Sequence, residues 1–145
     1  MDNVIIRNAD SKDIPALVGL IAELGYADSE EEVRKRFDIV SAAPAHKIFV
    51  AERERKIIGL MSFHALDLLY SAGKLGRITG LVVTEKESGS GIGKLLVAKA
   101  EELARDSGCK RIELTSNNRR TKAHKFYESI GFEANSKRFI KYINS

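Results

Sequence analysis

The chain has 145 residues, which is the size of one folded domain. Hydrophobic residues make up 43% and charged residues 30%, a balance that favours a globular protein over a disordered one. The formal charge of +4 is too small to indicate an obligate nucleic-acid binder. Because no apolar run is long enough to cross a membrane and no secretory signal is visible at the N-terminus, we expect a cytoplasmic protein that does not bind membranes.

The first part of the chain predicts strands and two amphipathic helices. Apolar and β-branched residues predict strands over 5–9, 47–52, 57–66 and 74–84, with a polar hairpin turn over 53–56. Helical spacing of apolar residues predicts a helix that begins at Asp10 or Ser11 and ends at Gly25. A second helix is expected to begin around Asp28 and to end before Pro44.

The second part predicts a helix that begins at Ile92 and ends at Gly108, a strand over 111–115, a helix over 121–130 and a terminal strand over 132–142. The resulting order of strands and helices does not follow strict βαβ alternation. The sequence therefore predicts an α+β protein with a mixed sheet.

A glycine-rich loop is the most informative stretch. Gly89, Gly91 and Gly93 lie between an apolar strand and the start of an amphipathic helix. Glycines allow a ligand to approach the backbone closely, and a helix N-terminus offers free N–H groups and a positive dipole end. We therefore expect a phosphate or pyrophosphate site here, beyond what a tight turn alone requires. The spacing fits neither a P-loop, because Ser88 and Leu95 replace required residues, nor the dinucleotide fingerprint G-x-G-x-x-G.

A third pattern fits. Leu81-Val82-Val83 followed by residues 88–94 resembles the acetyl-CoA motif of the GNAT superfamily of N-acetyltransferases, usually written Q/R-x-x-G-x-G/A. Gly91 and Gly93 match the motif, whereas Ser88 stands where the family usually has Arg or Gln. This departure removes a long side chain but leaves the backbone N–H groups. Residues 123–132 are similar to the same family's C-terminal segment A-x-x-F-Y-x-x-x-G-F.

The helix-rich N-terminus and the hairpin before Leu81 also match, so the resemblance covers nearly the whole chain and implies one N-acetyltransferase domain over 1–145. The implied fold has three layers (α/β/α), with a mixed central sheet flanked by helices and splayed between the strand of Leu81 and the strand over 111–115. The pantetheine arm of acetyl-CoA would lie in this splay and pair with strand backbone. The expected cofactor-binding residues are Leu81, Val82, Val83, Ser88, Gly89, Ser90, Gly91, Ile92, Gly93, Lys94, Asn117 and Asn118, the last two being equally explained as turn residues.

Tyr127 is the expected catalytic residue. The matching tyrosine of the family is a general acid, and a phenol with a pKa of about 10 can donate a proton to the departing sulfur at neutral pH. The alternative is a tyrosine that packs its ring in the core. The acceptor amine would attack the thioester directly in a ternary complex.

The general base is open. Gly80 occupies the position where family members often carry a glutamate, so no carboxylate is available there. His64, acting through water, and Glu113 are two candidates, and the acceptor could also bind as the small fraction of free amine. His124 lies three residues before Tyr127 and is expected to be structural or to orient a substrate.

Two other classes of site are not expected. No His, Asp or Glu residues have metal-ligand spacing, so we predict no metal. Cys109 is the only cysteine, which excludes a disulfide within the chain, and it is expected to be a small buried residue rather than a nucleophile.

The charges suggest two surfaces. Ten Lys and Arg against four Asp and Glu follow residue 104, including a cluster of Arg119, Arg120, Lys122 and Lys125 that would attract CoA phosphates or an anionic acceptor. This cluster is equally explained as a solvated helix face. Asp28 and the acids at 30–32 would attract a cationic amine, or serve only the helix dipole.

Three functions follow as hypotheses. The first is an acetyl-CoA-dependent N-acetyltransferase that acts on a primary amine of a small molecule or peptide. The second is a CoA-binding module with little activity, which the residues at positions 80 and 88 motivate. The third, a nucleic-acid binder, lacks aromatic residues interleaved with the basic ones and is not expected. A homodimer is left open, because many members of the family dimerise.

Overall fold

A computed structural model describes residues 3–144 of the chain. Met1, Asp2 and Ser145, which the predicted domain of 1–145 includes, lie outside the described residues. The chain divides into two compact units, Met1–Glu113 and Leu114–Ser145. The first unit contains the sheet and most of the helices.

One mixed sheet forms the centre of the first unit. Its strands are β1 (Val4–Asn8), β2 (His46–Arg53), β3 (Lys56–Asp67), β4 (Lys74–Val83) and β5 (Cys109–Glu113). They lie in the order β1-β2-β3-β4-β5, with the first four antiparallel and β5 parallel to β4. The α+β class and the mixed sheet are therefore confirmed, and each strand lies within two residues of its predicted bounds.

Three α-helices of the first unit have ends that the sequence encodes. They are α1 (Ile14–Leu24), α2 (Glu30–Ala42) and α3 (Ile92–Asp106). Asp10 caps a short 3-10 turn, Ser11–Asp13, that leads into α1, and Gly25 ends α1 with a φ of 116°. Ser29 caps α2 by accepting a hydrogen bond from the N–H of Glu32.

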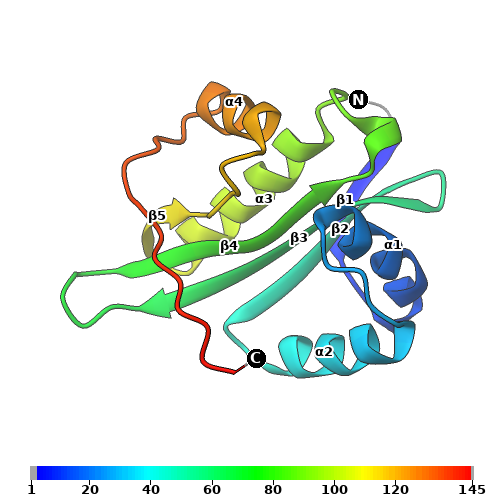
Figure 1. The fold of residues 1–145 in the computed structure, drawn as a ribbon, viewed down its shortest axis with the longest axis horizontal. Coiled ribbons are helices and arrows are strands. Elements are labelled where there is room, and N and C mark those ends of the chain that lie inside the picture. The colour runs from blue at the N-terminus through cyan, green and yellow to red at the C-terminus, as the bar shows by residue number, and fades with distance from the viewer. Residues whose placement is uncertain (1–2, 145) are drawn as a thin grey trace. The chain divides into compact units, whose positions relative to one another are not determined.

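The helices cover both faces of the sheet. Leu17 and Leu20 of α1 pack against Val50, Leu60 and Val82 of three neighbouring strands. On the opposite face, α3 approaches so closely that a Cβ on Gly59 would lie 3.0 Å from Cδ1 of Leu96. Figure 1 shows α1 and α2 across the sheet from α3. The predicted α/β/α layering is therefore confirmed.

The sheet splays between β4 and β5, as expected. The pairing of β4 with β5 ends at Arg77 and Glu113, whereas its pairing with β3 continues to Val83. Residues 78–83 consequently have one edge that β5 does not cover, and Figure 1 shows β5 beside only the first part of β4. A register shift near Ser62 and Phe63 accompanies the divergence.

The second unit contains one helix, α4 (Thr121–Ser129). The predicted strand over 132–142 is wrong, because no residue between 132 and 144 is in a strand. Phe139, Ile140 and Tyr142 have the apolar character of a strand but are exposed. High β-propensity forms a strand only where a partner strand and a packing surface are present, and this unit as described offers no strand to pair with.

Candidate functional site

The glycine-rich loop leads from β4 into α3. A single 3-10 turn, Glu85–Glu87, follows β4, and the backbone then passes through Gly89 and Gly91 at φ values of 80° and 88°. L-residues with a Cβ rarely adopt this left-handed conformation, which explains glycine at both positions. Gly91 is the N-cap of α3, and no side chain caps this helix. The N–H groups of Ile92, Gly93 and Lys94 therefore stay available at the positive end of the helix dipole.

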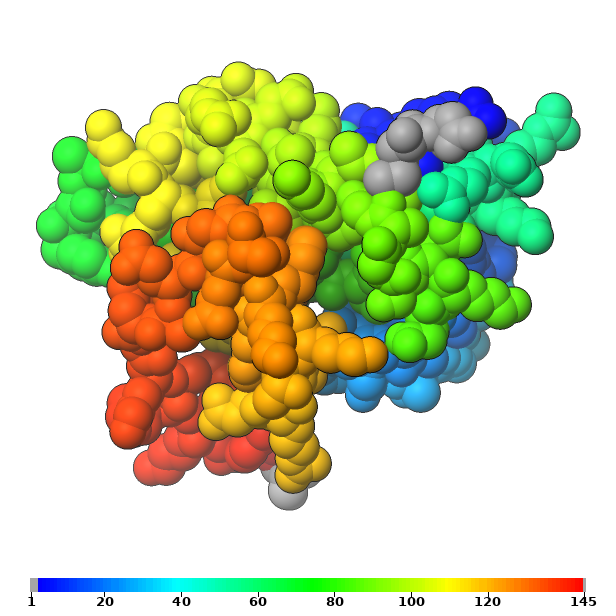
Figure 2. Space-filling view, turned by 90° about the horizontal axis from the view of Figure 1, so that it is seen from above, coloured from blue at the N-terminus to red at the C-terminus, as the bar shows by residue number. Residues whose placement is uncertain are grey.

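The loop is anchored by its own polar groups. Glu87 forms an ion pair with Arg53 of β2, and its carbonyl accepts hydrogen bonds from the N–H and hydroxyl groups of Ser90. The side chain of Ser90 is thus used inside the loop, whereas Ser88 is exposed. Figure 2 shows the bright green segment that includes residues 85–91 uncovered at the surface. The polar groups of the loop therefore bond within the loop or to β2 and leave the N-terminus of α3 without a side-chain cap.

The open edge of β4 offers backbone hydrogen-bonding groups. The N–H of Thr84 donates to the carbonyl of Ile58 on β3 at 2.9 Å, so Thr84 and Val82 direct their backbone groups toward β3. Alternation along a strand then directs the N–H and C=O groups of Leu81 and Val83 toward the uncovered edge. An extended chain with amide groups can pair with such an edge. Of the three predicted strand residues, Leu81 and Val83 therefore have backbone groups available.

Four polar side chains form a row across the face of the sheet on which α1 also packs. The register pairs His46 with His64, His64 with Arg77, and Arg77 with Glu113. Leu60 packs on α1. It lies on the same face as His64, because the two positions are four apart on β3 and side chains alternate between faces along a strand. We call His46, His64, Arg77 and Glu113 the polar row.

His46 and His64 are in direct ring contact. Their ring centroids lie 4.0 Å apart with planes tilted by 35°. The Nδ1 atom of His46 is buried and has no hydrogen-bond partner among the described residues. Burial, together with the neighbouring His46, lowers the pKa of His64. His64 is consequently a neutral imidazole at neutral pH, the form that can accept a proton.

Glu113 differs from His64 because its carboxylate is already occupied. It accepts hydrogen bonds from Arg77 Nη2 at 3.1 Å and from Arg111 Nε at 2.6 Å. The hydrogen bond from Arg111 to Glu113 raises the pKa of the Arg111 guanidinium. Of the two predicted base candidates, only His64 is free of an ion pair in the described structure.

Gly80 lies on the same face, near the register shift. A Cβ on Gly80 would lie 3.1 Å from the Ser62 hydroxyl oxygen, which in turn is 2.7 Å from the Thr79 hydroxyl oxygen. A carboxylate side chain at this position would crowd Ser62. The local packing of this chain therefore favours glycine at position 80, where a glutamate would have been a candidate base.

Tyr127 is the buried residue of α4. Its side chain is 8% exposed, and its ring contacts Phe126 and Phe132, with centroids 5.4 and 5.8 Å away. Burial raises the pKa of Tyr127, while Arg120 lowers it by a smaller amount. The phenol therefore carries its proton at neutral pH, as a proton donor requires.

The other predicted residues of the second unit lie at the start of α4. Asn117 forms a turn in which its side chain accepts from the Arg119 N–H at 2.9 Å. Its carbonyl oxygen is 2.9 Å from Nε2 of His124, so His124 ties the helix to this turn. Asn118 is exposed in the same turn. The basic cluster, comprising Arg119, Arg120, Lys122 and Lys125, is also exposed.

Asp28 and the acids at 30–32, which lie at the start of α2, have cationic partners. Asp28 pairs with Arg36, Glu30 with Arg34, and Glu31 and Glu32 with Lys35. These pairs lie at the surface, and acids in the first turn also favour the helix dipole. The contacts favour the structural alternative for this cluster over attraction of a cationic amine.

Cysteine and metal chemistry find little support in the geometry. Cys109 is partly buried, and burial raises the pKa of its thiol, which disfavours the reactive thiolate. Across residues 3–144, no three His, Cys, Asp or Glu side chains gather closely enough to hold a metal ion. No helix within this range is long and apolar enough to span a bilayer. Metal independence itself stays a prediction.

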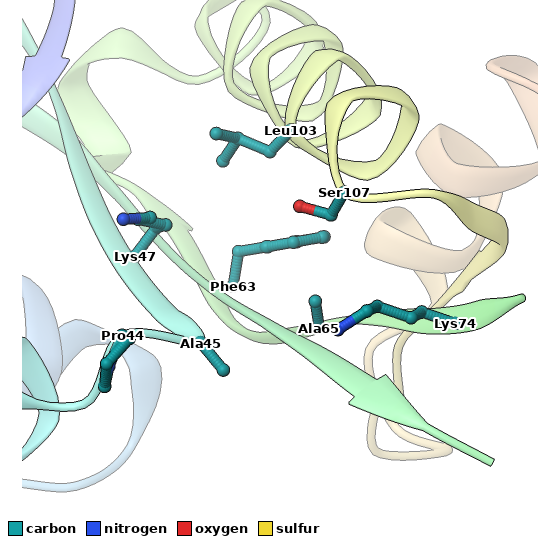
Figure 3. Close-up of a pocket in the computed structure, with 8 residues that line it drawn as sticks. All are labelled: Pro44, Ala45, Lys47, Phe63, Ala65, Lys74, Leu103 and Ser107. Carbon is teal, nitrogen blue, oxygen red and sulfur yellow. The ribbon is translucent and has the colours of Figure 1, made fainter.

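A separate pocket lies near the C-terminal end of α3. It has a volume of about 340 Å³, and Figure 3 shows Phe63 and Leu103 extending into it, with Lys47 and Lys74 on opposite sides. No predicted site residue lines it. The glycine loop is at the other end of α3, so this pocket is distinct from the expected cofactor site.

Sequence reasoning missed His46 and Arg77. Both enter the site only through the pairing of strands, which brings residues distant in sequence to one face. The predicted hairpin turn over 53–56 could have indicated His46, because counting back from the turn gives the approximate partner on β3 of each residue of β2.

Comparisons with known proteins agree with this geometry. The model of the acetyltransferase (GNAT) family matches residues 15–132. An aminoalkylphosphonate N-acetyltransferase from Salmonella typhimurium is 33% identical over 137 residues, covering 94% of this chain and 89% of that protein. A glucosamine 6-phosphate N-acetyltransferase from Trypanosoma brucei brucei is 30% identical, covering 73% and 67%.

The fold is similarly shared. A crystal structure described as a transcriptional regulator from Bacillus halodurans C-125 superimposes with a TM-score of 0.89 at 26% identity, covering 97% of this chain and 99% of that one. The family match spans most of the chain, and the curated relatives are N-acetyltransferases. The chain therefore belongs to the GNAT family of acetyltransferases.

Proposed function

We propose that this N-acetyltransferase moves the acetyl group of acetyl-CoA to the primary amine of a small molecule or peptide, by direct attack in a ternary complex. The observation that carries the proposal is the uncapped, glycine-lined N-terminus of α3 immediately after the open edge of β4. One end of this arrangement suits a pyrophosphate, and the other suits an extended amide chain. Acetyl-CoA contains both groups in that order.

The residues of the first unit fit the cosubstrate. The N–H groups of Ile92, Gly93 and Lys94 would hold the pyrophosphate, while the backbone of Leu81 and Val83 would pair with pantetheine. Gly89 and Gly91 keep side chains away from the phosphates. When bound, acetyl-CoA supplies an acetyl group on a thioester, which an amine can attack.

We propose His64 as the base. During transfer a C–N bond forms, the C–S bond breaks, and the amine nitrogen loses one proton. A neutral His64 can accept this proton directly or through water, whereas Glu113 is held by two arginines. His64 also lies on the face of the sheet where β4 turns away from β5.

We propose Tyr127 as the acid that protonates the departing sulfur. The match to the family segment over 123–132 supports this role, and the raised pKa of Tyr127 keeps its proton in place. The proton that the thiolate gains balances the one that the amine loses.

The acceptors named for the two curated relatives, an aminoalkylphosphonate and glucosamine 6-phosphate, are small molecules. Their names support a small-molecule acceptor over a peptide for this chain. We further propose one domain over 1–145, a cytoplasmic location and a homodimer. The exposed Phe139, Tyr142 and Ile143 favour a dimer contact, which light scattering of the purified protein would test.

A second candidate is a CoA-binding module with little activity. Gly80 leaves the usual carboxylate position empty of a side chain, and Ser88 offers no long side chain to the phosphates.

Two measurements on one preparation separate the candidates. Calorimetry measures acetyl-CoA binding, and thiol release is followed with a panel of primary amines. The proposed enzyme binds acetyl-CoA and releases thiol in proportion to the added amine. The module binds acetyl-CoA but releases no thiol above the amine-free rate with any acceptor.

A further inference from the structure

We propose that the polar row and Arg111 form the acceptor subsite, and that Arg77 and Arg111 hold a phosphate or phosphonate group of the acceptor while its amine lies at His64. This inference rests on the proposed function, because it assigns the second substrate of the same site. It goes beyond the proposed function because it names the class of acceptor and the residues that select this class.

This part of the sheet carries an excess of positive charge. Arg77 and Arg111 share a single carboxylate, that of Glu113. Arg111 and Glu113 are two residues apart on β5 and therefore lie on the same face as Arg77. The group retains one net positive charge, and each guanidinium has more N–H donors than its hydrogen bond to Glu113 uses.

The acidic cluster that could attract a cationic acceptor is neutralised by basic side chains. Asp28 and the acids at 30–32 are paired with Arg34, Lys35 and Arg36. Guanidinium groups recognise phosphate oxygens with two parallel hydrogen bonds, and two arginines suit a doubly charged group. An amine bearing phosphate or phosphonate thus fits this surface better than a polycationic amine.

The spacing of these residues limits the size of the acceptor. His64 and Arg77 are direct partners on neighbouring strands, and the Arg77 guanidinium extends to Glu113 on the next strand. Strands lie about 4.8 Å apart, so the base and the anion-binding group are separated by roughly 5 to 10 Å. The acceptor is therefore a small molecule in which a few bonds separate the amine from the anionic group.

The experiment measures binding to protein saturated with CoA, so that no turnover is needed. The probes are 2-aminoethylphosphonate and propylamine, which share an amine but differ in the anionic group, and calorimetry gives both affinities. We expect the wild-type protein to bind the phosphonate at least tenfold more tightly. Arg77→Gln should lose about 10- to 100-fold in phosphonate affinity and leave propylamine unchanged.

A second variant moves affinity in the opposite direction. Glu113→Gln removes the competing carboxylate and should strengthen phosphonate binding several-fold, a gain that structural damage does not produce. Arg34→Gln on α2 is the matched control and should change neither affinity. The inference is overturned if the wild type shows no preference for the phosphonate, if Arg77→Gln weakens both probes equally, or if Glu113→Gln weakens phosphonate binding.

Thiol release, measured separately, distinguishes a failure of the proposed subsite from a failure of the proposed enzyme activity. Phosphonate binding with these variant effects but no thiol release supports the subsite and contradicts the proposed enzyme. Thiol release that is equally fast with 2-aminoethylphosphonate and with propylamine supports the enzyme and contradicts the subsite.

Discussion

His46 and His64 stand opposite each other on β2 and β3, with ring centroids 4.0 Å apart. Burial disfavours a positive charge on His64, and the imidazole of His46 at this distance acts in the same direction. Burial and the pairing together lower the pKa of the proposed base. In the proposed mechanism, His64, which the strand register places beside His46, serves instead of the glutamate that is missing at Gly80.

This pairing predicts a shift in the pH profile. Since His64 has a pKa below the usual value of about 6.5, kcat/KM should fall on the acidic side only below that pH. His46→Gln removes the neighbouring imidazole, so the pKa of His64 should rise and the acidic limb should move to higher pH. His64→Gln should lower kcat about 100-fold or more and abolish the limb. An unchanged limb in both variants would assign the base elsewhere.

Tyr127→Phe should lower kcat by about 100- to 1,000-fold because the sulfur loses its proton donor. Affinity for acetyl-CoA should stay within about twofold, since the role concerns the leaving group. Tyr142→Phe is the control, because that ring is 85% exposed. Steady-state kinetics and calorimetry on the same preparations give both values. Equal loss of rate in the two variants would contradict the assignment.

Gly91→Ala should weaken acetyl-CoA binding about tenfold. Its φ of 88° places a Cβ in the left-handed region, which costs about 1–2 kcal/mol, and the new methyl group stands at the helix N-terminus where the phosphates would bind. Gly25→Ala provides the control, because Gly25 has a φ of 116° and open space around its Cβ position but lies at the end of α1. Both variants should lose stability, and only Gly91→Ala should lose affinity. Matching affinities would remove the loop from the cofactor site.

Ser88→Arg should tighten acetyl-CoA binding several-fold. The change restores the residue type usual in the resembled motif, and position 88 is exposed, so an arginine can be accommodated without crowding the core. The gain should shrink at high salt, as expected for a charge that meets phosphate at the surface. Calorimetry at two ionic strengths tests this, with Lys86→Arg as the control for added guanidinium near the loop.

The ion pair between Arg7 and Asp13 predicts an acid-sensitive fold. The Asp13 side chain is 6% exposed and accepts two hydrogen bonds of 2.8 Å from Arg7, which holds its pKa below the usual range. A carboxyl whose pKa is lowered by folding stabilises the protein above the unfolded pKa of about 4, and this stability is lost as the pH falls through the folded pKa. Arg7→Gln should cost about 2–3 kcal/mol at neutral pH, less than a fully buried pair, because Arg7 is partly exposed. Denaturation at pH 7 and pH 3 measures both effects, and a loss that is larger at pH 3 would contradict the sign.

Much of the fold could be predicted because local patterns encode it. Asp10, Gly25 and Gly91 mark helix ends by their side-chain and backbone chemistry, and the predicted splay follows from the strand order that the family resemblance implied. The strand over 132–142 failed because propensity says nothing of whether a partner strand exists.

The polar row shows why the site was harder to predict. Counting back from the turn, where Arg53 pairs with Lys56, would place His46 opposite Phe63. A register shift between Ala51 and Glu52 moves His46 by one residue, so that it meets His64 instead. A shift of one residue exchanges the two faces of a strand, and single-sequence patterns do not reveal where it occurs.

Mass spectrometry of the products formed from the wild-type protein, acetyl-CoA and 2-aminoethylphosphonate tests the proposed acetyl transfer most directly. We expect an acetylated amine, heavier by one acetyl group, that appears in equal amount with free CoA and only when enzyme is present. Release of CoA without acetylated amine, or no reaction under conditions where calorimetry shows that both substrates bind, would contradict the proposed acetyl transfer.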